Sequence, residues 1–181
     1  TLIAKRKLPH AILFSGEQGI GKKTLAESLA YSLLTGKEEI QFENNNPTLT
    51  RMRQGSHMDY LYISGDNNEK TKNNIISVDQ VREISLFLSK TRGESSVRVI
   101  LIDGAEDMNV NAANALLKNL EEPPDNTVII CISHNPYSLL ATIRSRLRVF
   151  KFTPISPNDC RAIVEENLTD ALNYSSEDLD L

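Results

Sequence analysis

A glycine-rich stretch that ends in lysine carries the clearest chemistry in the sequence. Residues 16–22 read GEQGIGK, after a short apolar run and before a helical pattern. Glycines let backbone N–H groups turn inward around phosphate oxygens, while the lysine and the helix N-terminus add positive charge. We therefore predict that Gly16, Gly19, Gly21 and Lys22 form a phosphate-binding loop in a nucleotide site. The alternative is a merely tight glycine turn.

The residue after this loop departs from the pattern of an active site. That position normally carries a serine or threonine whose hydroxyl holds magnesium, and here it is Lys23. Thr24 comes one residue late, about a hundred degrees around the helix, and cannot simply substitute. The sequence therefore predicts no bound metal at the loop.

An acidic residue at the end of a buried strand supplies the second half of the expected site. Residues 97–102 form a run that is apolar except for Arg98 and that ends at Asp103. Hydrolysis in this class needs a carboxylate beside that aspartate to activate water, but the neighbour is Gly104. Glu106, two residues further on, is interpreted as pointing elsewhere. We expect no hydrolysis, while ATP or ADP held as a fixed ligand stays open, with the charge of Lys23 partly replacing magnesium.

Strands alternate with helical segments around these residues. The predicted strands cover residues 10–15, 60–63, 97–102, 127–132 and 148–152. Alternation of this kind is typical of a parallel sheet covered by helices on both faces. We therefore predict an α/β fold with a doubly wound, parallel, five-stranded sheet of the phosphate-loop type.

The helices between these strands have recognisable ends. One runs from the loop to Gly36, and a second follows Ser77, which forms a capping-box pattern with Gln80. Others are predicted over residues 112–121, stopped by two prolines, and over residues 138–146. The polar, asparagine-rich segment 36–57 is interpreted as an excursion from the sheet.

The pattern changes beyond residue 153. Ser156 and Pro157 form an N-cap followed by a first-turn proline. We predict a core domain over residues 1–153 and the beginning of a helical lid domain over residues 154–181. The chain lacks an initiating methionine and stops inside this new pattern, so it is interpreted as a fragment of a longer protein.

Composition excludes several classes of protein. Of the 181 residues 40% are hydrophobic and 24% charged, as in ordinary globular domains. No apolar run approaches the roughly 20 residues that cross a bilayer. The two cysteines, Cys131 and Cys160, are far apart and lack metal-ligand spacing, which favours a cytoplasmic setting. The net charge of −4 argues against binding DNA by bulk electrostatics.

Four motifs resemble the core of bacterial clamp-loader subunits of the AAA+ class. They are HAILF (residues 10–14), DGAEDM (103–108), NAANALLKNLEEPP (111–124) and LLATIRSR (139–146). The resemblance covers about residues 8–168. It implies a role in DNA replication within a five-subunit ring that contains delta and gamma/tau subunits and loads a sliding clamp onto primed DNA. It also implies a collar domain beyond Leu181.

Two branches of this family match the sequence. One is the ATP-hydrolysing gamma/tau motor, which would use Lys22 and Asp103 here. The other is the delta-prime subunit of DNA polymerase III, a relatively rigid ring member. Lys23 and Gly104 favour the delta-prime branch, with no ATPase activity of its own.

The resemblance also assigns a role to Arg146. The family carries Ser-Arg-Cys where this chain has Ser145, Arg146 and Leu147, and it uses the arginine in trans on the ATP of a neighbouring subunit. A guanidinium can stabilise charge on a transferring phosphoryl group. Arg146 is therefore the expected arginine finger. The alternative is a surface or structural arginine.

Two further family positions are expected to be inactive here. Ser133 matches a polar position near the γ-phosphate but is interpreted as a strand-end hydroxyl. Many relatives carry a four-cysteine zinc module, whereas residues 37–57 contain no cysteine. His57 alone cannot make a four-ligand site, so we predict no zinc.

Overall fold

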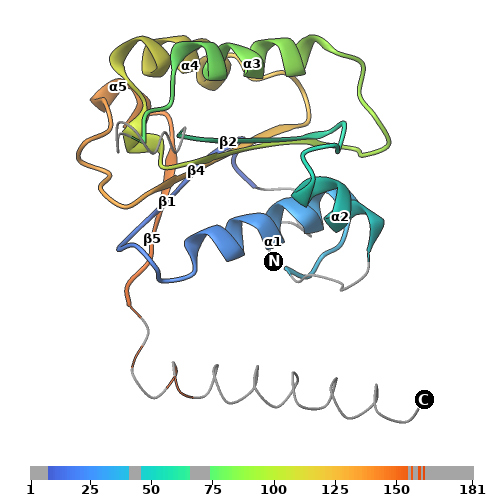
Figure 1. Cartoon of the computed structure of the whole chain (residues 1–181), viewed down its shortest axis with the longest axis horizontal. Coiled ribbons are helices and arrows are strands. Elements are labelled where there is room, and N and C mark those ends of the chain that lie inside the picture. Colours follow the sequence, from blue (N-terminus) through green and yellow to red (C-terminus); the bar gives the residue numbers. More distant parts are fainter. Residues whose placement is uncertain are drawn as a thin grey trace.

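A parallel sheet with helices on both faces forms the centre of the molecule (Figure 1). The computed structural model describes residues 8–40, 46–65 and 74–154, together with residues 156, 159 and 161. The five strands of this part are ordered β2-β3-β4-β1-β5, and each neighbouring pair is parallel. The elements are β1 (Ala11–Ser15), α1 (Lys22–Thr35), α2 (Pro47–Arg53), β2 (Tyr60–Ser64), α3 (Val78–Ser89), β3 (Arg98–Asp103), the 3-10 helix η1 (Ala105–Asp107), α4 (Val110–Glu121), β4 (Thr127–Ser133), α5 (Ala141–Arg144) and β5 (Arg148–Lys151).

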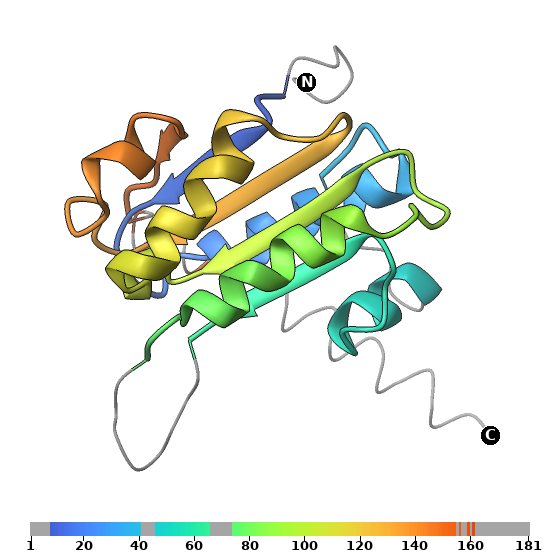
Figure 2. The same cartoon turned by 90° about the horizontal axis from the view of Figure 1, so that it is seen from above.

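Two hydrophobic cores lie on opposite faces of the sheet. Helices α3, α4 and α5 cover one face, and α1 with α2 covers the other (Figures 1 and 2). Along β4, Ile129 and Cys131 belong to the first core, while Ile130 and Ile132 belong to the second. Successive side chains of a strand point to opposite faces, so a strand covered on both sides needs apolar residues throughout.

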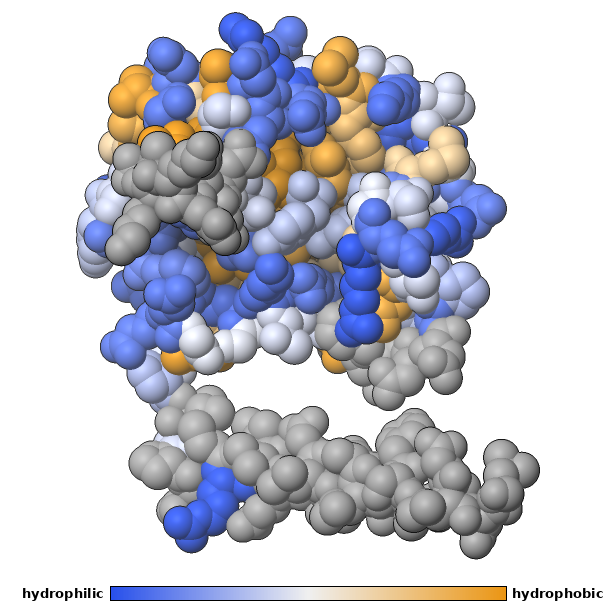
Figure 3. All heavy atoms as spheres, viewed as in Figure 1, coloured by the Kyte–Doolittle hydropathy of each residue, from blue (hydrophilic) through white to orange (hydrophobic). Residues whose placement is uncertain are grey.

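This architecture confirms the predicted doubly wound α/β fold. All five predicted strands are present, with ends that differ by one residue at most. The three central strands are almost entirely buried, whereas β5 at the sheet's edge is largely exposed. On the face shown in Figure 3, hydrophobic side chains emerge in patches between hydrophilic ones. Most of the large apolar side chains of the described residues are nevertheless buried in the two cores.

Side-chain caps begin helices α3 and α4. The predicted capping box of α3 is present, with Ser77 Oγ accepting from Gln80 N and Gln80 Oε1 accepting from Ser77 N. At α4, Asn109 Oδ1 accepts from Ala112 N at 2.8 Å. These bonds satisfy backbone donors that have no partner within a helix.

Two helix predictions need correction. The segment 36–57 contains α2, which the sequence analysis did not predict although Asn46 and Pro47 form an N-cap and first-turn proline pair. Leu49 and Met52 of α2 pack into the core under α1. The helix expected over residues 138–146 is only the four residues of α5, because the chain must turn sharply there to enter β5.

The boundary near residue 154 falls where the described structure becomes sparse. Ser156 Oγ accepts from Asp159 N at 3.2 Å, as the expected N-cap would. Most of the predicted lid domain over residues 154–181 lies outside the described residues, as does Cys160. Within the described part of the chain, no helix has the length and apolar character needed to span a membrane.

Candidate functional site

The loop of residues 16–22 connects the end of β1 to the start of α1. Gly21 is the N-cap of α1 and has φ of +86°, a left-handed conformation that glycine adopts without strain. At Gly16, a Cβ would collide with the carbonyl oxygen of Phe152. The loop borders a cavity of about 370 Å³ that is also lined by Asp103 and His134. The predicted loop residues and Asp103 are therefore brought together at one end of the sheet.

Lys22 is buried and serves the loop itself. Lys22 is only 3% exposed. Its Nζ donates to the carbonyl oxygen of Gly16 at 2.8 Å and to that of Glu17. Burial lowers the pKa of Lys22, although the negative charges of Glu106 and Asp103 oppose the shift. In this arrangement the ammonium neutralises the dipoles of the loop's own carbonyl groups.

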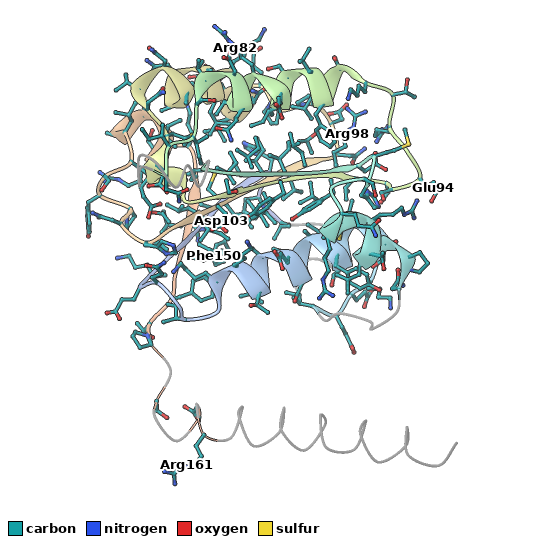
Figure 4. The ribbon with its side chains drawn as sticks, viewed as in Figure 1. Arg82, Glu94, Arg98, Asp103, Phe150 and Arg161 are labelled. Carbon is teal, nitrogen blue, oxygen red and sulfur yellow. The ribbon has the colours of Figure 1, made fainter. Side chains whose placement is uncertain are left out.

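Lys23 lies against the aspartate that a metal ion would otherwise approach. Its Nζ is 3.3 Å from Asp103 Oδ2 and donates to the Tyr62 hydroxyl at 2.7 Å. That hydroxyl in turn donates to Asp103 Oδ2 at 2.9 Å. In Figure 4, Asp103 lies at one end of β3 and Arg98 at the other end of the same strand. Lys23, Tyr62 and Asp103 thus form a closed triangle, which we call the Lys23 cluster.

Electrostatics hold the Lys23 ammonium in its charged form. Burial alone would lower the pKa of Lys23, but hydrogen bonds and charge interactions with Tyr62 and Asp103 raise it above its usual value. The ammonium also lies 4.6 Å from the centre of the Tyr62 ring, within cation–π range. Tyr62 comes from β2, so this cluster depends on a strand that the sequence analysis did not connect with the loop.

Glu106 is closer to the site than the sequence analysis expected. Its Oε1 accepts from the backbone N–H groups of His134, at 2.7 Å, and Asn135, at 3.2 Å. Its negative charge raises the pKa of Lys22 more strongly than that of Asp103 does. Glu106 therefore ties η1 to the end of β4, and its field acts on the loop lysine.

Ser133 ends β4 beside this site. It is fully buried, and its Oγ has no hydrogen-bond partner among the described residues. Its carbonyl oxygen accepts from Gly16 N at 3.3 Å, which links the end of β4 to the loop. Ser133 therefore contacts the loop through its backbone carbonyl group and not through its hydroxyl.

Arg146 lies at the other end of β1 from the loop. It precedes β5, whose first residue Arg148 pairs with Ile12 near the start of β1. Arg146 Nη2 is 2.5 Å from Glu121 Oε1, and Nη1 donates to Thr142 O at 2.8 Å. Sequence reasoning identified the arginine but missed its partner. The motif LLKNLEEPP contained the signal, because Glu121 is in it.

His57 is a buried structural residue. Its Nδ1 accepts from Asp59 N at 3.1 Å, and burial lowers its pKa. In the described ranges no three histidine, cysteine, aspartate or glutamate side chains gather in a way that could hold a metal ion. The absence of zinc stays a prediction.

Comparison with known proteins agrees with the motifs. The family described as "DNA polymerase III, delta subunit" matches residues 1–156. The chain is 43% identical over 138 residues to DNA polymerase III subunit delta' of Pseudomonas aeruginosa, covering 76% of this chain and 41% of that protein. For the delta' subunit of Bacillus subtilis the identity is 35% over 158 residues, covering 86% and 45%. The chain therefore spans less than half the length of these relatives.

Solved structures share the fold. A gamma subunit-related protein of Thermotoga maritima superposes with a TM-score of 0.60 at 24% identity, covering 91% of this chain and 48% of that one. A RuvB mutant of the same organism gives a TM-score of 0.56 at 15% identity, covering 93% and 47%. These structures agree with the fold, and the family match with its curated relatives confirms the family predicted from the motifs. The chain belongs to the DNA polymerase III delta-prime family of clamp-loader subunits.

Proposed function

We propose that this chain is the core of a non-hydrolysing subunit of the DNA polymerase III clamp loader. The whole subunit would sit beside gamma/tau and delta subunits and help to place a sliding clamp on primed DNA. One observation supports the inactive role above all: the Lys23 ammonium lies 3.3 Å from Asp103 Oδ2. A magnesium ion at this carboxylate would have to approach that fixed positive charge.

Repulsion is one of two obstacles to hydrolysis. Magnesium normally bridges the phosphates and a hydroxyl of the loop, but Lys23 provides an ammonium in place of that hydroxyl. Gly104, next to Asp103, has no carboxylate to activate water. Glu106 is engaged with two backbone N–H groups and does not replace it. Lys23 and Gly104 therefore both act against ATP hydrolysis.

A nucleotide would also have to rearrange Lys22. Its Nζ donates to carbonyl groups of the loop, so a phosphate must attract it away from them. We propose that any ATP or ADP held here binds without magnesium and is not turned over. Such a ligand would have a structural role.

Arg146 is proposed to act on a neighbouring subunit. It lies at the opposite end of β1 from the chain's own loop, on the outside of the core. A guanidinium supplied by one subunit to the ATP of another can stabilise the charge of the transferring phosphoryl group. This would make the subunit an activator of a gamma/tau motor.

ATP turnover by the isolated full-length protein tests the inactive role. We expect none above background. The gamma/tau-type reading would replace this proposal if the protein turned over ATP at about 1 per second, the low end for phosphoryl-transfer enzymes such as kinases, and Lys22→Ala abolished it.

A further inference from the structure

Glu121 contacts the Arg146 guanidinium. The carboxylate contacts Nη2 at 2.5 Å from the end of α4, while Thr142 O accepts from Nη1 within α5. The next residue, Leu147, is only 7% exposed and packs in the core of the α3–α4 face. The guanidinium of Arg146 is therefore held by Glu121, and its backbone is held by the buried neighbour Leu147.

These contacts leave much of the guanidinium available. Arginine has five N–H donors in a planar fork, and only Nη1 and Nη2 have partners among the described residues. The side chain of Arg146 is 35% exposed and that of Glu121 is 48% exposed. The pair can thus face a second anion from solvent without first being broken.

We infer that Glu121 is a positioning residue for Arg146, holding the guanidinium in one direction before the neighbouring subunit's phosphates meet it. This inference rests on the proposed function of Arg146. A free arginine loses much rotamer freedom when it docks, and a side chain already held in place loses less. The benefit should therefore appear in the rate of the reaction that Arg146 assists.

Glu122 provides a matched control. It follows Glu121 directly, is exposed, and makes no side-chain hydrogen bond or ion pair with the described residues. Glu121→Ala and Glu122→Ala remove the same charge from adjacent positions. A difference between them therefore reports on contact with Arg146 and not on net charge.

The experiment measures clamp- and DNA-stimulated ATP hydrolysis by reconstituted loaders that contain the full-length protein. The relevant quantity is the part of the rate that Arg146→Ala removes. Exposed ion pairs contribute modestly, so Glu121→Ala should lower this part about twofold to fivefold through kcat, with KM for ATP unchanged. Glu121→Gln keeps an acceptor oxygen and should fall between Glu121→Ala and wild type, while Glu122→Ala should match wild type.

The double variant separates positioning from a structural role. In the Arg146→Ala background, Glu121→Ala should cause no further loss. A further loss there, or an unchanged or higher rate for the single variant Glu121→Ala, would overturn the inference while leaving the proposed function intact. If Arg146→Ala itself had no effect, the proposed function would fail, and the role of Glu121 with it.

Discussion

The two charged regions of this molecule use similar residues in opposite ways. In the loop and the Lys23 cluster, both lysines have partners within the chain, and the side chain of Asp103 is 19% exposed while that of Lys23 is 50% exposed. At Arg146, the arginine is 35% exposed and Glu121 is 48% exposed, and Nε of the fork has no partner among the described residues. The charged groups of the first region are paired with one another and with the loop, whereas the guanidinium of the second keeps a donor for a further partner.

Under the proposed function, this difference lets one fold lack hydrolysis and still supply an arginine to a neighbouring subunit. In that proposal a cation stands where a hydroxyl would hold magnesium, and the ammonium of Lys23 contacts Asp103 and Tyr62 instead. The outward-facing arginine needs nothing from that site. The two regions lie at opposite ends of β1 and share no residue.

The largest expected effect comes from removing the outward-facing arginine. In GTPases an arginine supplied in trans is worth roughly a thousandfold or more. Arg146→Ala should strongly reduce hydrolysis at the one motor site beside this subunit, so the whole loader, with its other motor sites, should show a partial defect. Steady-state ATPase and clamp loading of reconstituted complexes would measure it.

Two further variants sharpen this test. Arg146→Lys should not restore activity, because an ammonium cannot reproduce the planar fork. Arg148→Ala removes a nearby exposed arginine and should match wild type. Equal activity for all of these variants would mean that Arg146 is only a surface charge and that the contrast between the two regions has no functional meaning.

A smaller effect should distinguish the regions by stability. Asp103→Ala leaves the Lys23 ammonium without its carboxylate, so a double-mutant cycle for this pair should give a coupling free energy of about 1 kcal/mol. The cycle for Arg146 and Glu121 should give about 0.5 kcal/mol or less, because at 35% and 48% exposed neither side chain is as buried as that of Asp103, which is 19% exposed. Urea unfolding of the full-length protein measures both. A larger coupling at Arg146 would reverse the comparison.

The smallest effect concerns alkaline pH within the loop region. The lowered pKa of Lys22 means that the unfolded state binds more protons just below pH 10.5, so this residue makes stability rise with pH there. Lys22→Met should therefore lose stability more steeply as pH rises toward about 10.5. The raised pKa of Lys23 gives stability that is present below pH 10.5 and lost above it.

Lys23→Met should accordingly flatten the decline above about pH 10.5. Urea midpoints of the wild type and both variants, followed over this pH range, give the two slopes. Slopes that change in the same direction for both variants would show that the two lysines do not occupy the contrasting environments described here.

Patterns between near neighbours in the sequence were sufficient for most of the fold. The apolar run before Asp103, the capping box at Ser77 and the glycines before Lys22 each depend on residues within about four positions of one another. The helix α2 also had such a signal in Asn46 and Pro47, but the polar composition around it hid the short apolar face that Leu49 and Met52 bury.

Tertiary structure alone decided how the charged residues are paired. Tyr62 reaches Lys23 and Asp103 because β2 is hydrogen-bonded to β3 in a register that aligns Ser64 with Asp103. Glu121 reaches Arg146 because α4 ends beside the turn between α5 and β5. The sequence by itself determined the family, the strands and the loop, since these depend on local pattern. The partners of Lys23 and Arg146 depend on strand order and register, which join residues far apart in the chain.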